Sequence, residues 1–113
     1  HYFNIITQIH KIFPITVVIS GGATGADKLG EIWAQKRLIH TEIYPADWDK
    51  YGKRAGPIRN HHMATKADAA IIYPGGKGSS NMLSQALKEG LPVFVVRDMG
   101  WFDSTEPGEQ FKA

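Results

Sequence analysis

Two glycine-rich turns, each placed between a short apolar run and an amphipathic stretch, constrain the fold of this chain most strongly. The first turn covers residues 21–27 and the second turn covers residues 74–80. Glycine lets the backbone approach an anion closely, and the helix after such a turn presents unpaired N–H groups to it. Because ligands bind at the carboxyl ends of strands in open parallel sheets, two such turns can share one site. The pattern predicts binding of a nucleotide or a similar molecule.

Apolar periodicity predicts helices and strands in alternation. The apolar stripe from Tyr2 to Phe13 predicts a helix that ends at Pro14. A continuous β-branched run predicts a strand buried on both faces over residues 15–20. Further strands are predicted over residues 40–44, 69–73 and 92–96. Helices are predicted over residues 26–38 and 81–88, one after each glycine turn. The order favours an α/β fold with a parallel sheet flanked by helices.

Two segments give weaker signals. Residues 46–60 contain Gly52, Gly56 and Pro57 among aromatic and charged residues, which predicts a long loop followed by a short helix capped by Asn60. From residue 103 onward the chain is polar, and we expect residues 103–113 to form a frayed tail. The chain of residues 1–113 is therefore predicted to be a single domain.

Composition narrows the classes of function. A formal net charge of +2 on 113 residues is too small to indicate a nucleic-acid partner by itself. The absence of cysteine excludes disulfides and thiolate chemistry. No apolar run approaches the roughly 20 residues of a membrane span, so we expect no membrane partner and a cytoplasmic location. His61 and His62 are adjacent and no HExxH pattern is present, so we expect no metal ligands and no cofactor.

Three groups of residues carry a resemblance to a known family. They are SGGATGAD at residues 20–27, PADW at residues 45–48 with GPIRN at residues 56–60, and PGGKGSSNM at residues 74–82. In this order they resemble the YspA-like branch of the SLOG superfamily (DUF2493, YpsA-related), which is related to the LOG phosphoribohydrolases and to Smf/DprA. The resemblance implies a Rossmann-like nucleotide-binding domain of a kind common in bacteria and their phages.

The chain departs from the family pattern at two places. Nothing before His1 supplies the family's first strand, which is central in Rossmann-like sheets, so we expect an N-terminally incomplete domain. LOG hydrolases carry a catalytic glutamate three positions after the threonine of their second turn, and the corresponding residue here is Met82. A thioether cannot act as an acid or a base. The sequence therefore leaves open whether the chain is an enzyme, and it names no catalytic residue.

The candidate ligand-binding residues lie in the two turns and just before residue 61. The planar guanidinium of Arg59 suits a phosphate, Lys77 offers a point charge, and Asp27 suits a ribose hydroxyl. The turns contribute backbone N–H groups and hydroxyls. The full set is Gly21, Gly22, Thr24, Gly25, Asp27, Arg59, Asn60, Pro74, Gly75, Gly76, Lys77, Gly78, Ser79 and Ser80.

Each candidate also has a structural interpretation. Both turns serve equally as plain connections between strand and helix, and Asp27 and Asn60 are suited to cap helices. Arg59 could pair with an aspartate, Asp47 or Asp49, and thereby hold the loop.

Three functions remain. The first is a binding module that senses or sequesters a nucleotide or nucleotide-derived molecule. The second is a LOG-like hydrolase that uses another carboxylate. The third is single-stranded DNA binding, as in DprA, through a local basic patch formed by Lys50, Lys53, Arg54 and Arg59. Related folds pair through helices that flank the sheet, so a homodimer is a further expectation.

Overall fold

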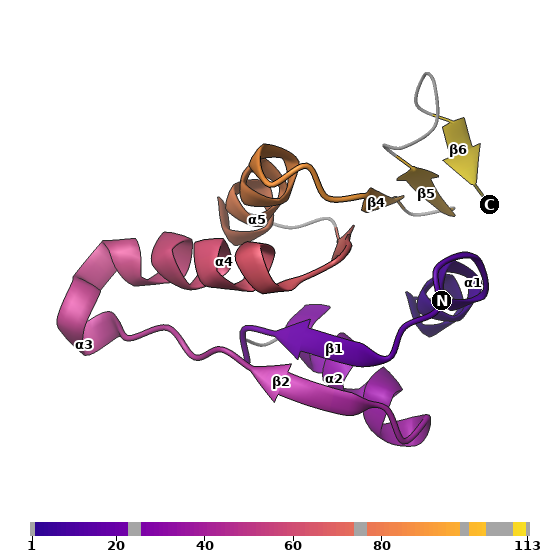
Figure 1. Cartoon of the computed structure of the whole chain (residues 1–113), viewed down its shortest axis with the longest axis horizontal. Coiled ribbons are helices and arrows are strands. Elements are labelled where there is room, and N and C mark those ends of the chain that lie inside the picture. The colour runs from indigo at the N-terminus through magenta and orange to yellow at the C-terminus, as the bar shows by residue number, and fades with distance from the viewer. Residues whose placement is uncertain (1, 23–25, 74–76, 98–99, 104–109, 113) are drawn as a thin grey trace. The chain divides into compact units, whose positions relative to one another are not determined.

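The computed structural model describes residues 2–22, 26–73, 77–97, 100–103 and 110–112 (Figure 1). The chain forms two compact units, His1–Pro45 and Ala46–Ala113. No described helix is long and apolar enough to cross a membrane.

The first unit contains two helices and a two-stranded parallel sheet. Its elements are α1 (Tyr2–Ile12), β1 (Val17–Ser20), α2 (Ala26–Lys36) and β2 (His40–Ile43), and Val17 lies opposite His40 in the parallel register (Figure 1). Helix α2 ends two residues before the predicted end, and Leu38 beyond it takes a left-handed conformation with φ 57°. The buried side chains of α1 and α2 are Ile5, Ile6, Ile9, Trp33 and Ala34.

Trp33 fastens α2 to α1. Its indole Nε1 donates a hydrogen bond to Thr7 Oγ1 at 3.1 Å, and its ring meets the His10 ring edge-on with centroids 5.4 Å apart. The Arg37 guanidinium carbon lies 5.1 Å from the centroid of the same indole. His10 in turn accepts a hydrogen bond from the Ile15 backbone N–H at 2.9 Å. The buried Trp33 indole therefore joins α2 to α1. It also contacts His10, whose hydrogen bond to Ile15 fixes the chain between α1 and β1.

The second unit combines helices with a four-stranded sheet. Its helices are α3 (Trp48–Tyr51), the 3-10 helix η1 (Gly52–Arg54), α4 (Ala55–Lys66) and α5 (Lys77–Lys88). Its strands are β3 (Ala70–Ile72), β4 (Val93–Arg97), β5 (Gly100–Asp103) and β6 (Gln110–Lys112), in that order across the sheet. Strands β3 and β4 are parallel, whereas β5 and β6 continue the sheet in antiparallel fashion. A buried cluster of Ala70, Ile72, Ala86 and Val93 joins α5 to β3 and β4.

The predicted α/β fold is confirmed. All four predicted strands are present and pair in parallel, β1 with β2 and β3 with β4, consistent with a Rossmann-like arrangement. The strands form two small sheets rather than one. Strand β6 lies in the segment for which we expected a frayed tail, and it pairs with β5.

The loop predicted over residues 46–60 is wrong, because most of this segment is helical. The Asp47 carboxylate caps α3 by accepting a hydrogen bond from the Lys50 backbone N–H at 3.1 Å. Pro57 lies in the first turn of α4, where no intrahelical N–H bond is required. Gly56 admits the Trp48 ring, since a Cβ at residue 56 would lie 3.3 Å from Trp48 Cη2. Residues that usually break helices therefore serve here in helix starts and close packing.

The two edges of the first sheet differ in chemistry. Strand β2 carries His40 and Glu42 and is largely exposed. Strand β1 has the sequence Val-Val-Ile-Ser without any charged residue, and among the described residues only β2 pairs with it. Native proteins commonly protect a sheet edge with charged residues, and β1 has none.

Candidate functional site

The second turn leads directly into α5, which begins at Lys77 rather than at the predicted Asn81. Gly78, Ser79 and Ser80 are therefore part of the first helical turn and not of a loop. Pro74, Gly75 and Gly76 lie outside the described residues, as does the side chain of Lys77. Since α5 is 12 residues long, its N-terminal N–H groups and dipole suit an anion at this end.

Asn60 connects α4 to this end of α5. It is 5% exposed, and its amide nitrogen donates to Asn81 Oδ1 at 3.0 Å and to the Gly78 carbonyl at 3.4 Å. The predicted role of Asn60 as a helix cap is wrong, because α4 begins five residues earlier, at Ala55. Its buried amide instead fixes the first turn of α5 against the middle of α4.

The same amide orients Arg59. Arg59 Nε donates to Asn60 Oδ1 at 2.9 Å, so both the oxygen and the nitrogen of the Asn60 amide are engaged. The structural alternative for Arg59 was a pair with Asp47 or Asp49, and Asp47 Oδ1 accepts the hydrogen bond that caps α3. Three site residues on two helices, Arg59, Asn60 and Gly78, therefore form one hydrogen-bonded group.

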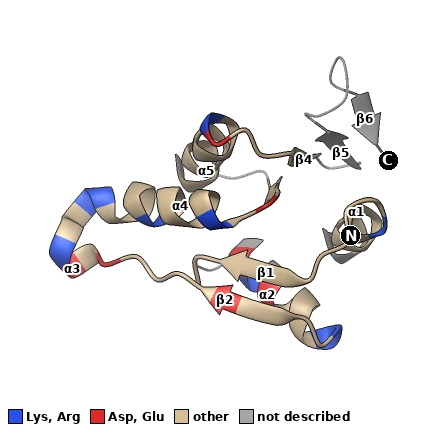
Figure 2. Ribbon diagram, viewed as in Figure 1, with Lys and Arg blue, Asp and Glu red and all other residues tan. Residues whose placement is uncertain are grey.

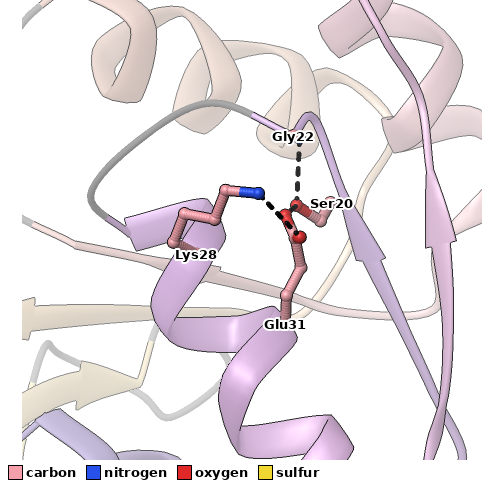
Figure 3. Close-up of polar contacts among 4 residues, drawn as sticks. All are labelled: Ser20, Gly22, Lys28 and Glu31. Carbon is pink, nitrogen blue, oxygen red and sulfur yellow. Dashed lines mark hydrogen bonds and ion pairs between the residues drawn. The ribbon is translucent and has the colours of Figure 1, made fainter.

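The first turn is shaped by the last residue of β1. Ser20 is 2% exposed, and its hydroxyl accepts a hydrogen bond from the Gly22 N–H at 3.1 Å (Figure 3). The hydroxyl donates in turn to Glu31 Oε2 at 2.7 Å, and Lys28 Nζ lies 3.4 Å from Glu31 Oε1. Gly21 is buried and Asp27 lies in the first turn of α2, whereas Thr24 and Gly25 lie outside the described residues. The Gly22 N–H, predicted to face a ligand, is bonded to Ser20.

Gly22 has a backbone conformation that favours glycine. Its φ is +75°, and a Cβ at this position would lie 3.1 Å from Ile43 Cγ2. We expect Gly22→Ala to lower the free energy of unfolding by about 2 kcal/mol, since a left-handed L-residue alone costs roughly 1–2 kcal/mol. Gly78→Ala is the matched control, because no atom lies within 4 Å of its added Cβ. In urea unfolding, Gly78→Ala should leave the free energy of unfolding unchanged or raise it by up to about 1 kcal/mol. Equal effects of both substitutions would contradict the role assigned to Gly22.

Sequence reasoning missed two polar residues in the helices that follow the turns. Asn81 was placed at a helix start, yet it accepts the hydrogen bond of Asn60 from one turn inside α5. Glu31 was not among the predicted site residues, yet it is partly buried and accepts a hydrogen bond from Ser20, 11 residues earlier in the sequence. Its position four residues after Asp27 was the available signal, because that spacing puts both carboxylates on one helix face.

Met82 lies against the apolar core of the second unit. It packs against the cluster of Ala70, Ile72, Ala86 and Val93. The residue at the position of the LOG glutamate therefore contributes to the core of the second unit. Among the residues that the structure describes, no group of three His, Asp or Glu side chains is placed to hold a metal ion.

Comparison with known proteins identifies the family. A family model described as "YspA, cpYpsA-related SLOG family" matches residues 3–51. The Gene 61 protein of Mycobacterium phage D29 is 36% identical over 99 residues, which cover 80% of this chain and 79% of the phage protein. The chain belongs to the YspA, cpYpsA-related SLOG family. No solved structure matches it.

The SLOG match includes the whole first turn. Its range, residues 3–51, contains β1, α2 and β2, and with them Ser20, Gly22 and Glu31. The hydrogen bonds of the first turn are thus formed by residues within the segment that matches the family model.

Proposed function

We propose that this SLOG protein binds a nucleotide or a nucleotide-derived molecule and acts as a sensor or sequestering module. Membership of the SLOG family supports a nucleotide-related function. In the proposal, the phosphate lies at the N-terminal end of α5. Gly78, Ser79 and Ser80, which belong to the first turn of this helix, contribute backbone N–H groups and hydroxyls there.

One observation carries the proposal, namely the group formed by Arg59, Asn60 and Gly78. The buried Asn60 amide holds a guanidinium on α4 next to the start of α5. A helix N-terminus and an arginine together favour a phosphate through aligned N–H groups and a delocalised positive charge. The core position of Met82 favours binding over glycosidic cleavage by the LOG route.

The test is a binding panel with an arginine variant. Nucleoside mono-, di- and triphosphates, dinucleotides and cyclic nucleotides are titrated into the full chain by calorimetry. At one hundred times its dissociation constant, a ligand should stabilise the chain by about 2.7 kcal/mol. We expect Arg59→Ala to weaken binding of the best compound about tenfold or more, as hydrogen bonds to charged groups contribute about 1.5–3 kcal/mol.

Arg54→Ala is the matched control. Arg54 is exposed at the end of η1, and its loss removes the same charge from the same unit. If Arg59→Ala loses affinity and Arg54→Ala does not, the ligand contacts Arg59 directly. A general effect of the positive charge of this unit would weaken both variants. Absence of binding by a folded chain across the panel, or equal affinity of both variants, would contradict the proposal.

A second candidate, single-stranded DNA binding, is favoured by the surface of α3 and η1. Trp48 is 59% exposed, and Lys50, Lys53 and Arg54, which follow it closely in the sequence, are exposed as well. Figure 2 marks basic residues in blue on α3 and on the segment that leads from α3 to α4. Exposed aromatic side chains among basic residues are typical of surfaces on which bases stack. An oligonucleotide in the same panel distinguishes the two candidates. Binding that falls steeply with salt and depends on Trp48 would favour DNA.

A further inference from the structure

Trp48 exposes an aromatic ring beside the first turn of α4. The residue is 59% exposed, although tryptophan is highly buried on average in folded proteins. Its Cη2 atom packs against Gly56, where an added Cβ would lie 3.3 Å from it. The Asp47 carboxylate caps α3, the four-residue helix that begins with Trp48. The indole is therefore held at one edge while most of the residue is open to solvent.

The contact with Gly56 places this ring on the face of α4 that leads to the start of α5. Gly56 and Asn60 are four residues apart in α4, so they share a helix face and lie about 6 Å apart along its axis. Asn60 bonds the Gly78 carbonyl in the first turn of α5, and it also accepts from Arg59 Nε. All of these residues belong to the second unit. Helix α4 thus brings an exposed indole within one helical turn of the group formed by Arg59, Asn60 and Gly78.

An exposed indole at this distance from an anion site suits the base of a nucleotide. Every base has an apolar face that stacks on an aromatic side chain, whichever hydrogen-bonding groups its edge carries. The sugar of a nucleotide separates the base from the phosphate by a comparable distance. Tyr51 in the same helix is less suited to stacking, because Lys50 Nζ lies over its ring, 5.1 Å from the centroid.

We propose that the base of the bound nucleotide stacks on the indole of Trp48. The inference rests on the proposed function and assigns the base, in addition to the phosphate, to the second unit. It narrows the ligand to a molecule that carries an aromatic base, and it excludes a simple sugar phosphate. Because stacking reads the face of a base and not its edge, all four common bases should bind without a strong preference for one.

The experiment compares ligands with and without a base on the full chain. The four ribonucleoside 5′-monophosphates and ribose 5-phosphate are titrated by calorimetry. The wild-type chain should bind the monophosphates about tenfold or more tightly than ribose 5-phosphate, as expected for one stacked base.

Trp48→Ala tests the residue itself. Its affinity for the monophosphates should fall about tenfold, while its affinity for ribose 5-phosphate stays unchanged. Trp48→Phe keeps a smaller aromatic face and should restore part of the affinity. Leu87→Ala is the matched control, because Leu87 is 54% exposed and lies in the last turn of α5, at the opposite end from the proposed phosphate. It should keep the full difference between the ligands.

The outcomes separate the two proposals. Equal affinity of the wild-type chain for the monophosphates and ribose 5-phosphate would overturn the stacking on Trp48 and leave nucleotide binding intact. Tighter binding of the monophosphates that persists in a folded Trp48→Ala variant would also overturn it. No binding of any nucleotide would overturn the proposed function and this inference together. The wild-type comparison needs no substitution, so it stands even where Trp48→Ala impairs folding.

Discussion

Replacement of Trp33 by alanine should lower the free energy of unfolding by about 4 kcal/mol, the largest effect expected for a single side chain here. Trp33 is 3% exposed and packs where α1 meets α2. Its removal leaves a large cavity and takes away the Nε1 donor that bonds Thr7. It also removes the indole faces that contact His10 and Arg37. Urea unfolding followed by circular dichroism measures the change independently of tryptophan fluorescence.

Two further variants show whether the loss of stability is specific to the Trp33 side chain. Trp48→Ala is the matched control, because Trp48 is 59% exposed, and it should change stability by about 1 kcal/mol or less. Trp33→Phe keeps most of the apolar volume and loses the hydrogen bond to Thr7, so its effect should be intermediate. A Trp33→Ala variant that loses no more stability than Trp48→Ala would show that the first unit does not depend on Trp33.

Replacement of Asn60 by alanine should lower the free energy of unfolding by about 3 kcal/mol. The amide is 5% exposed and bonds Arg59, Gly78 and Asn81. Alanine removes these bonds and leaves the polar partners without the buried amide that joins them. The expected loss combines one hydrogen bond to a charged group with unsatisfied neutral groups. Thermal or urea unfolding of the full chain measures it.

The controls for Asn60 separate its amide from a general effect of removing asparagine. Asn4→Ala makes the same change at an exposed position of α1 and should be nearly neutral. Asn81→Ala removes a single partner of Asn60 and should have a smaller effect, of about 1 kcal/mol. A stable Asn60→Ala variant would mean that the start of α5 does not depend on this network.

Apolar runs predicted β1 and β3 correctly because a short, unbroken apolar segment between turn residues favours a strand. Val17–Ser20 and Ala70–Ile72 lie inside the predicted strands and pair in parallel as expected. The α4 region was missed because Gly56 and Pro57 normally interrupt helices. Here both residues lie in the first turn of α4, where Pro57 needs no intrahelical N–H bond and the missing side chain of Gly56 leaves room for the Trp48 ring.

The sequence predicted which residues belong to the candidate site, but it did not predict the hydrogen bonds between them. Gly22 and Gly78 were candidates because they lie in glycine-rich turns after apolar runs. Arg59 was a candidate because its planar guanidinium suits a phosphate. The partners that orient these residues come from distant positions, since Ser20 bonds Glu31 and Asn60 bonds Asn81. Periodicity reports which face of a helix is apolar. It does not report which polar side chain reaches across to another element.

The uncharged edge of β1 has a consequence for handling the protein in solution. Its four residues, Val17–Ser20, carry neither a lysine nor a proline. In the first unit taken by itself, β1 pairs among the described residues with β2 alone, so a strand from another molecule can add to its other side. Self-association should therefore rise with protein concentration. A single lysine introduced at Val17, which is 39% exposed, is the mildest way to suppress it.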